Sequence, residues 1–369
     1  MNRSRARLFI SLAGLLIAMR LPADQLSIWT PQSSGTTNDF FAVAYGNGTF
    51  VAVGTNGTLY TSTDATTWTS RDSGTTNELN GITYGKGLFV AMGGNGATHI
   101  STDGILWPGY LSGFNGAWHA VTYGNGRYAA VGFGGTIKVS DTATNWTLVA
   151  SPTTNTLQAV IWANGRYVAS GFHGTIVTSP DGTTWTEQVS GSSVALHTLA
   201  YGAGRFVVAG YTGELLTSPD AVTWTLQNSG TTNSLRGAIY TNGLFVLTGF
   251  RGTIISSPDG INWTFRPSSA TNALRSIAYG RGGFVTVGHR GTILRSAVAP
   301  TITNVSFTGN ISRFAFDTAN GLMYRVEYAD SLSAPAWTLL YHVAGIGGLI
   351  TTNDPTATVP RRFYRVGIE

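Results

Sequence analysis

SPDGTTW, residues 179–185, is one copy of a motif that returns along most of the chain. Further copies read STDATTW at 62–68, STDGILW at 101–107, SPDAVTW at 218–224 and SPDGINW at 257–263. The tryptophan that ends the motif belongs to a ladder with a constant spacing of 39 residues. The members of this ladder are Trp29, Trp68, Trp107, Trp146, Trp185, Trp224 and Trp263. A single repeated unit therefore builds most of this protein.

One copy of the repeat has the pattern of four antiparallel strands. In the first full copy the apolar or alternating segments are FFAVAY (40–45), TFVAVG (49–54), TLYTST (58–63) and WTSRDS (68–73). The turns between them carry glycine and asparagine, which supply the positive φ that tight hairpins demand. Strand-rich repeats of about 40 residues are typical of propeller blades rather than of helical solenoids.

The last copy is incomplete, and the missing piece lies at the start of the repeat region. GTILRS (291–296) is followed by Ala297, Val298 and Pro300 instead of a turn and a tryptophan. LSIWTPQSSGTTN (26–38) matches the fourth-strand segment WTLQNSGTTN (224–233) but has no earlier strands of its own. Pairing of residues 27–32 with 292–296 closes the ring and removes exposed strand edges. The sequence predicts an all-β fold, a seven-bladed β-propeller over 24–298 closed by its N-terminal strand.

The turn motif resembles the Asp-box, Ser-x-Asp-x-Gly-x-x-Trp, of sialidase-like (BNR-like) propellers. The longer pattern VGxxGTIxxSxDGxxW is similar to the repeats of the photosystem II stability and assembly factor family, which implies a seven-bladed propeller that acts by binding. These resemblances cover residues 27–298. The aspartates at the motif position are Asp64, Asp103, Asp181, Asp220 and Asp259. We expect them to accept hydrogen bonds from backbone amides and fix the turn, rather than to bind calcium or act in catalysis.

The first 23 residues have the pattern of a secretory signal peptide. Arginines at positions 3, 5 and 7 precede a short apolar run from Leu8 to Met19, and a small residue stands at Ala23. This run is shorter than the roughly 20 residues of a membrane span. We therefore expect an exported protein, periplasmic, at the cell surface or extracellular, without a membrane span in the mature chain.

Charge and cysteine content narrow the function classes. Removal of residues 1–23 takes four arginines and no acid, so the formal charge falls from +5 to +1. Phosphate binding needs a surplus of Lys and Arg, so a nucleic-acid partner is excluded. The chain has no cysteine, and hence no disulfide and no thiolate metal ligand.

After Pro300 the 39-residue spacing stops. TITNVSF, ISRFAFD, LMYRVEYA, AWTLLYHV and RRFYRVGI alternate apolar and polar residues, which predicts a small β-sandwich-like domain over 299–369. This segment resembles a module appended to many large secreted bacterial proteins, which implies surface attachment or binding. Its aromatic residues could form a sugar platform, but in alternating strands we expect them to be core. They are Tyr324, Tyr328, Trp337, Phe363 and Tyr364.

At two positions of the repeat, near one mouth of the propeller channel, the seven copies carry different polar, charged or aromatic residues. The column at the start of the innermost strand reads Phe41, Asn80, His119, Gln158, His197, Arg236 and Arg275. The loop between the second and third strands carries the pairs Thr55–Asn56, Gly94–Asn95, Phe133–Gly134, Phe172–His173, Tyr211–Thr212, Phe250–Arg251 and His289–Arg290. Histidine, arginine and aromatic residues concentrate in the last five copies.

Imidazole, guanidinium and aromatic groups around a concave mouth suit a carboxylate-bearing ligand, an acidic peptide or a sugar. The alternative is a solvated polar rim without a ligand. The candidate ligand-binding residues are His119, Phe172, His173, His197, Tyr211, Arg236, Phe250, Arg251, Arg275, His289 and Arg290.

Two other chemistries stay open at this mouth. His119, His173, His197 and His289 are conceivable zinc ligands, but they belong to different repeats, so we expect no metal and no cofactor. Sialidase-like hydrolysis needs an arginine cluster, a tyrosine nucleophile with a glutamate base, and an aspartate acid, and the candidate acids at the mouth are Asp39, Glu78 and Glu214 near Tyr211. Other glycoside hydrolysis needs two carboxylates that face each other, and the sequence supplies no obvious pair. We favour a monomeric, secreted, non-enzymatic binding or assembly scaffold for a protein or carbohydrate ligand, with a glycan-active hydrolase as the alternative.

Overall fold

The computed structural model describes residues 7–10, 16–19, 26–111, 116–297, 302–308, 311–318, 323–331, 337–346, 349–354 and 363–368. The chain divides into two compact units. The repeat unit is Trp29–Arg295, and the terminal unit combines Met1–Ile28 with Ser296–Glu369.

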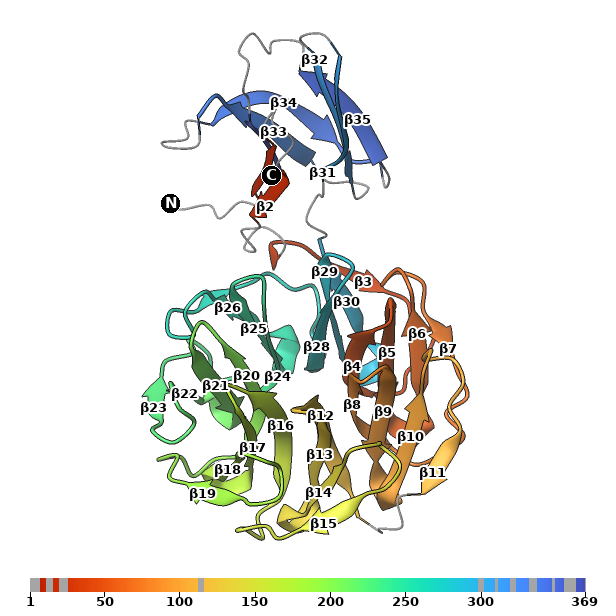
Figure 1. Ribbon diagram of the computed structural model, residues 1–369, viewed down its shortest axis with the longest axis vertical. Coiled ribbons are helices and arrows are strands. Elements are labelled where there is room, and N and C mark those ends of the chain that lie inside the picture. Colours follow the sequence, from red (N-terminus) through yellow and green to blue (C-terminus); the bar gives the residue numbers. More distant parts are fainter. Residues whose placement is uncertain are drawn as a thin grey trace. The chain divides into compact units, whose positions relative to one another are not determined.

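Seven four-stranded sheets, numbered here in chain order, occupy the described part of the repeat region (Figure 1). Sheets 1 to 3 are β4 (Phe40–Gly46), β5 (Thr49–Gly54), β6 (Leu59–Ser62) and β7 (Thr69–Ser70); β8 (Leu79–Gly85), β9 (Leu88–Gly93), β10 (Ala97–Ser101) and β11 (Gly109–Leu111); and β12 (Trp118–Gly124), β13 (Arg127–Gly132), β14 (Ile137–Ser140) and β15 (Thr147–Val149). Sheets 4 and 5 are β16 (Leu157–Ala163), β17 (Arg166–Gly171), β18 (Ile176–Ser179) and β19 (Thr186–Gln188); and β20 (Leu196–Gly202), β21 (Arg205–Gly210), β22 (Leu215–Ser218) and β23 (Thr225–Gln227). Sheets 6 and 7 are β24 (Leu235–Thr241), β25 (Leu244–Gly249), β26 (Ile254–Ser257) and β27 (Thr264–Phe265); and β28 (Leu274–Gly280), β29 (Gly283–Gly288), β30 (Ile293–Ser296) and β3 (Trp29–Gln32).

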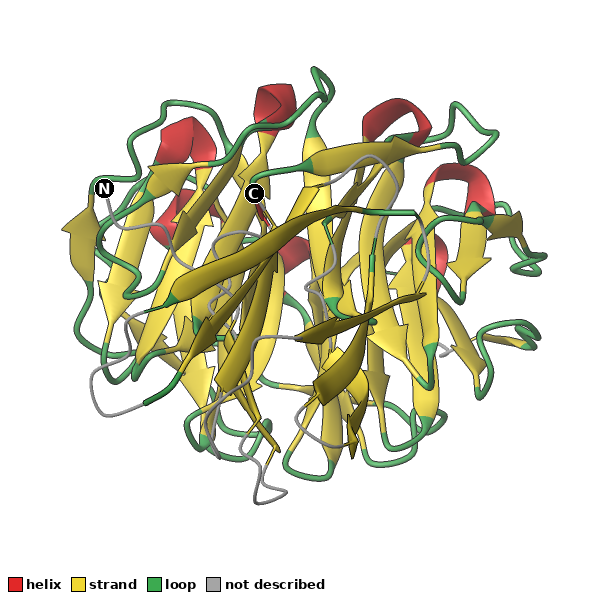
Figure 2. Cartoon of the chain, turned by 90° about the horizontal axis from the view of Figure 1, so that it is seen from above, coloured by secondary structure: helices red, strands yellow, loops and turns green. Residues whose placement is uncertain are grey.

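Turn chemistry explains why each copy folds in the same way. The first hairpin of sheet 1 turns through Asn47 and Gly48, at φ 45° and 75°, the positive values that an Asn-Gly pair tolerates best. Between the second and third strands of each sheet lies a short 3-10 turn, so these turns share one end of the sheets (red in Figure 2). They are η2 (Thr55–Gly57), η3 (Gly94–Gly96), η4 (Phe133–Gly135), η5 (Phe172–Gly174), η6 (Tyr211–Gly213), η7 (Phe250–Gly252) and η8 (His289–Gly291).

The motif aspartates hold the turn between the third and fourth strands. In sheet 4, the Asp181 carboxylate accepts hydrogen bonds from the backbone N–H groups of Thr183 (2.8 Å) and Thr184 (3.0 Å). The indole N–H of Trp185 donates to the Gly182 carbonyl (2.8 Å), and its ring packs at 6.2 Å from the ring of Tyr167. In sheet 4 the motif therefore joins a hydrogen-bonded turn to a buried aromatic contact.

The innermost strands of the sheets neighbour one another in a closed cycle. β4 lies against β8, and the series continues through β12, β16, β20 and β24 to β28, which lies against β4. Sheet 7 obtains its fourth strand, β3, from the residues that precede sheet 1. Ser34 Oγ, next to β3, donates a hydrogen bond to the carbonyl of Gly291 (2.8 Å). The all-β repeated architecture that the sequence predicts is therefore confirmed.

The terminal unit is also built of strands. Two three-stranded sheets have the orders β31-β32-β35 and β34-β33-β36. Their strands are β31 (Ile302–Thr308), β32 (Ile311–Asp317), β33 (Met323–Ala329), β34 (Thr338–Ala344), β35 (Leu349–Asp354) and β36 (Phe363–Ile368). Phe314, Phe316, Tyr324 and Tyr364 share one buried cluster, so two of the possible platform tyrosines are core residues.

The region expected to be a signal peptide lies largely outside the described residues. Within it, β1 (Arg7–Ile10) pairs with β2 (Leu16–Met19) in an antiparallel hairpin. No helix in the described parts of the chain has the length and hydrophobicity to cross a membrane.

Candidate functional site

A β-bulge recurs at the start of the innermost strand of every sheet in the repeat unit. In sheet 5, Leu196 pairs with Gly210 and Thr198 pairs with Ala209, so His197 is left between two successive pairs. A side chain on Gly210 would overlap the Ala195 carbonyl oxygen, which explains why glycine faces the bulge. A bulge bends its strand and redirects the extra side chain. The bulged residues are Phe41, Asn80, His119, Gln158, His197, Arg236 and Arg275.

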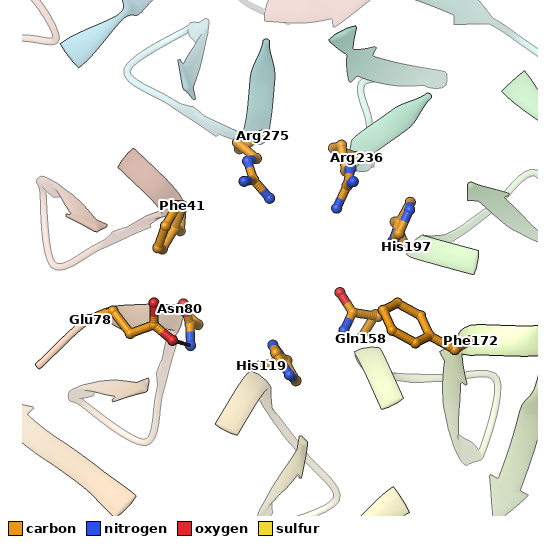
Figure 3. A pocket seen from close by; sticks show the side chains of 9 residues that line it. All are labelled: Phe41, Glu78, Asn80, His119, Gln158, Phe172, His197, Arg236 and Arg275. Carbon is orange, nitrogen blue, oxygen red and sulfur yellow. Dashed lines mark hydrogen bonds between the residues drawn. The ribbon is translucent and has the colours of Figure 1, made fainter. Parts of the chain in front are cut away.

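These bulged side chains converge on one pocket, with a cavity volume of about 340 Å³ (Figure 3). Besides the bulged residues, Glu78 and Phe172 line it. The bulged residues occupy the same position in each repeat. They form a ring around the pocket because the same bulge recurs in every innermost strand of the closed cycle. We refer to this cavity as the central pocket.

Two guanidinium groups form the basic side of the central pocket. Arg236 and Arg275 come from the neighbouring strands β24 and β28, and both point into the pocket (Figure 3). The Arg236 guanidinium lies over the ring of Phe250 at 5.2 Å, and that of Arg275 over the ring of Phe41 at 5.0 Å. Burial, followed by the charge of Arg275, lowers the pKa of Arg236 to about 10. Both side chains remain cationic at neutral pH.

His289 orients Arg275 and is itself neutral. The Nε–H of Arg275 donates to Nε2 of His289 at 2.8 Å. Burial and the Arg275 charge lower the pKa of His289, which keeps this nitrogen available as an acceptor. The same nitrogen lies 3.9 Å from Oδ2 of Asp39, but a neutral imidazole makes no ion pair with that carboxylate. Asp39 instead accepts the backbone N–H of Arg290 through Oδ1 (2.8 Å).

His197 is the most deeply buried polar residue of the pocket, with 9% of its surface exposed. Neither ring nitrogen of His197 has a hydrogen-bond partner, and the same holds for Nε of Arg236. Burial, with the charges of Arg236 and Arg275 next in importance, lowers the pKa of His197 to about 3. The ring therefore offers one donor and one acceptor at neutral pH. Buried polar atoms are normally satisfied, so these atoms mark a place where a ligand can complete the bonding.

Glu78 stands on the side of the pocket away from the arginines (Figure 3). Its Oε1 accepts a hydrogen bond from Nδ2 of Asn80 (3.2 Å), which also donates to the Trp118 carbonyl (3.1 Å). Burial lowers the pKa of His119, against the opposing effect of the Glu78 charge. This side of the pocket therefore presents a carboxylate with amide and imidazole groups.

The structure separates the predicted ligand-binding residues into three groups. Five line the central pocket: His119, Phe172, His197, Arg236 and Arg275. Phe250 and His289 lie outside the pocket lining and contact Arg236 and Arg275, respectively. The remaining four lie on the 3-10 turns, exposed and outside the pocket lining: His173, Tyr211, Arg251 and Arg290.

Four lining residues were not in the predicted ligand-binding set: Phe41, Glu78, Asn80 and Gln158. The signal for three of them was present in the sequence, because they occupy the same repeat column as the arginines. Glu78 lies outside that repeat position, and the sequence indicates it only as a candidate acid for hydrolysis. Its position in the pocket follows from the turn that precedes β8.

The alternative chemistries find little support in this arrangement. Of the candidate acids, only Glu78 lines the pocket, and Asp39 is engaged by the backbone of Arg290. Within the described residues, no three His, Asp or Glu side chains are placed to hold a metal ion. The candidate zinc ligand His173 is exposed on η5, whereas His119 and His197 line the pocket.

No family model matches the chain, and no curated protein is similar to it in sequence. Solved structures do share its fold. YCF48 bound to D1 peptide has a TM-score of 0.61 and 19% identity, with 73% of this chain and 94% of that chain covered. YCF48 from Cyanidioschyzon merolae gives 0.60 and 18%, covering 73% and 98%. The WD40 β-propeller domain of Doa1 gives 0.59 and 16%, covering 73% and 97%. The fold is thus that of a β-propeller similar to YCF48.

Proposed function

We propose that this protein is a binding or assembly scaffold whose central pocket receives a carboxylate from a peptide segment of a partner protein. The observation that carries the proposal is the pair Arg236 and Arg275, half-buried in one pocket beside His197 with its unsatisfied nitrogens. Among the described residues neither guanidinium forms an ion pair. Guanidinium groups bind carboxylates through two parallel hydrogen bonds, which would satisfy this desolvated pair.

A peptide is favoured over a sugar as the source of the carboxylate. One structure with the same fold, YCF48, is bound to D1 peptide, which shows that this architecture can present a peptide site. Propeller folds serve many functions, so the residues of the pocket have to decide the ligand. An acidic sugar is the competing ligand in the experiment below.

We also infer the domain organisation and the localisation of the protein. Residues 24–298 form a seven-bladed propeller with Asp-box turns, supported by the seven described sheets and their closed cycle. Residues 299–369 form a β-sandwich-like module, supported by two three-stranded sheets that share one buried cluster. We place the mature protein outside the cytoplasm, as a monomer, with residues 1–23 removed as a signal peptide.

The test compares two double variants of the full mature chain. Arg236→Ala with Arg275→Ala removes the guanidiniums of the pocket, whereas Arg251→Ala with Arg290→Ala removes two exposed ones. Binding of an acidic peptide library is measured by calorimetry, with uronic-acid oligosaccharides in parallel. The pocket variant is expected to lose roughly 100-fold or more in affinity, since a charged hydrogen bond contributes about 1.5–3 kcal/mol.

The control variant is expected to bind within about threefold of the wild type because its arginines lie in solvent. Equal losses in both variants would show that binding depends on overall charge and not on the pocket. Binding of oligosaccharides but not of peptides would replace the peptide with a sugar as the ligand.

A further inference from the structure

Charge is distributed unevenly around the mouth of the central pocket. Sheets 6 and 7 contribute Arg236 and Arg275, which form the basic sector. Glu78 is the residue that precedes the first strand of sheet 2. The lining residues of sheets 3 to 5, which lie between Glu78 and the arginines in the cycle of strands, carry no charge. These are His119, Gln158, Phe172 and His197. The pocket therefore has a positive side and a negative side separated by hydrogen-bonding and aromatic groups.

The Glu78 carboxylate is accessible to a ligand in the central pocket. Its side chain is exposed, and within the described residues its hydrogen bond is made by Oε1, which accepts from Asn80. Asn80 is fixed by its second bond to the Trp118 carbonyl, so it orients the carboxylate without neutralising its charge. Glu78 thus differs from Asp39 at the same position of sheet 1, which holds the backbone of Arg290.

The charge of Glu78 is felt across the pocket. Burial lowers the pKa of His119, and the Glu78 charge opposes that shift. Burial also lowers the pKa of Arg275 in the basic sector, and the charges of Asp39 and then Glu78 oppose it. Glu78 would therefore repel a purely anionic ligand that binds the arginines, because the lining between Glu78 and the arginines holds no cation to offset the two negative charges. A ligand that also carries a cation would instead gain a second ion pair in a partly desolvated site.

We propose that the central pocket recognises an amphoteric peptide segment, with a carboxylate on Arg236 and Arg275 and an ammonium or guanidinium group on Glu78. This inference rests on the proposed function and narrows its ligand. His197 and Gln158 lie between the two charges and are suited to bond the uncharged backbone or side-chain groups that connect them. The unsatisfied nitrogens of buried His197 are the second observation that points to an occupant.

The spacing of the two charges on the peptide follows from strand geometry. In an extended chain, side chains of residues i and i+2 point to the same side and lie about 7 Å apart. A cavity of about 340 Å³ accommodates side chains of this separation but not a folded domain. The shortest motif that puts both charges on one side of an extended peptide is an acidic residue followed, two positions later, by Lys or Arg, and this motif is the one to test.

The experiment uses end-blocked peptide mixtures of the form X-Asp-X-Lys-X, X-Asp-X-Gln-X and X-Asn-X-Lys-X, where X is randomised. Their affinities for the full mature chain are measured by calorimetry at low and physiological salt. We expect the Asp–Lys mixture to bind about tenfold more tightly than the Asp–Gln mixture, and the Asn–Lys mixture to bind most weakly.

The matched variants are Glu78→Gln, which keeps an acceptor for Asn80, and Asp72→Asn, which removes an exposed acid elsewhere in the repeat unit. In Glu78→Gln the Asp–Lys and Asp–Gln mixtures should bind equally, whereas Asp72→Asn should keep the tenfold preference. Equal binding of both mixtures to the wild type, still dependent on Arg236 and Arg275, would overturn the amphoteric ligand and leave the proposed function intact. Failure of every acidic mixture to bind would overturn both.

Discussion

At the scale of single residues, the turn between the third and fourth strands depends on one side-chain acceptor. The Asp181 carboxylate accepts two backbone N–H groups at 2.8 and 3.0 Å. In sheet 3, Thr142 occupies this position, and the corresponding bonds to its hydroxyl from Thr144 and Asn145 are longer, at 3.4 and 3.3 Å. Hydrogen bonds to a charged acceptor are shorter and stronger, so the turn of sheet 3 is the weaker one.

Thr142→Asp is expected to raise the thermal midpoint by a few degrees, because two backbone donors gain a charged acceptor worth about 1 kcal/mol. Asp141, already paired with Arg127 at 2.7 Å, will oppose the new charge, so the gain should increase with salt. Differential scanning calorimetry at two salt concentrations measures both effects. Asp181→Thr is the reciprocal control and should lower the midpoint; an unchanged midpoint in both variants would rule out the acceptor as the source of turn stability.

At the scale of elements, β14 carries a lysine where most equivalent strands carry an apolar residue and β10 carries His99. Lys138 has no exposed surface, whereas Leu216 and Leu294 occupy the same position in sheets 5 and 7. Its ammonium lies 4.1 Å from the ring centre of Trp118 and 4.8 Å from that of Trp146. Burial lowers the pKa of Lys138 to about 7. The two aromatic faces partly replace the water that this charge has lost.

Lys138→Leu is expected to stabilise the protein by about 1–4 kcal/mol at pH 7, because a well-packed apolar side chain replaces a buried charge. The folded state releases the lysine proton near pH 7, but the unfolded state keeps it to about pH 10. Wild-type stability therefore rises with pH across this window, and the advantage of the leucine variant should shrink between pH 7 and pH 10.

Denaturant unfolding at both pH values measures that difference. Leu216→Lys places the same ammonium at the equivalent position of sheet 5. There Leu196 stands where sheet 3 has Trp118, so the ammonium lacks that aromatic face and the variant should be strongly destabilised. A loss of stability in Lys138→Leu that does not vary with pH would show that the lysine contributes a specific bond.

The elements also show what the sequence could predict. The 39-residue spacing was sufficient for the strands, the hairpins and the closing strand, because these depend on local patterns such as Asn47–Gly48. The bulge at His197 could not be predicted, since it repeats in every copy and so leaves the spacing unchanged. Without the bulge, the residues that enter the pocket could not be distinguished from Arg251 and its neighbours on the 3-10 turns. The burial of Lys138 could not be predicted, because a charged residue in an alternating strand normally faces solvent.

At the scale of the whole molecule, buried histidines make stability depend on pH in one direction. Burial lowers the pKa of His99, His119, His197 and His289 in the folded state. In the unfolded chain these groups take up protons near pH 6.5. Between pH 6.5 and the lower folded values the unfolded state binds more protons, so stability falls as the solution is acidified. The turn aspartates add to this loss only at lower pH, because their unfolded carboxyls protonate near pH 4.

The fall in thermal midpoint from pH 7 to pH 5 is therefore expected to be smaller in His197→Gln than in the wild type. At pH 5 a histidine held neutral costs about 2 kcal/mol, and Gln is the residue that sheet 4 carries at this position. Calorimetric scans at pH 8, 7, 6 and 5 provide the comparison, with pH 8 as the reference where the histidines are neutral in both states. Parallel curves for the two proteins would show that His197 does not contribute to the acid sensitivity.

The closing strand β3 also determines the order in which the fold can be completed. Ser34 and Gly291 bond across 257 positions of sequence, so this contact is among the most non-local in the chain. Hairpins such as β4–β5 need only nearby residues and can form early, whereas the loop-closure entropy of the final junction is lost in one step. During synthesis β3 must wait, unpaired, until β30 has followed it. Its exposure ends only when the ring closes, which makes late folding the interval in which this chain is most prone to pair with another copy of itself.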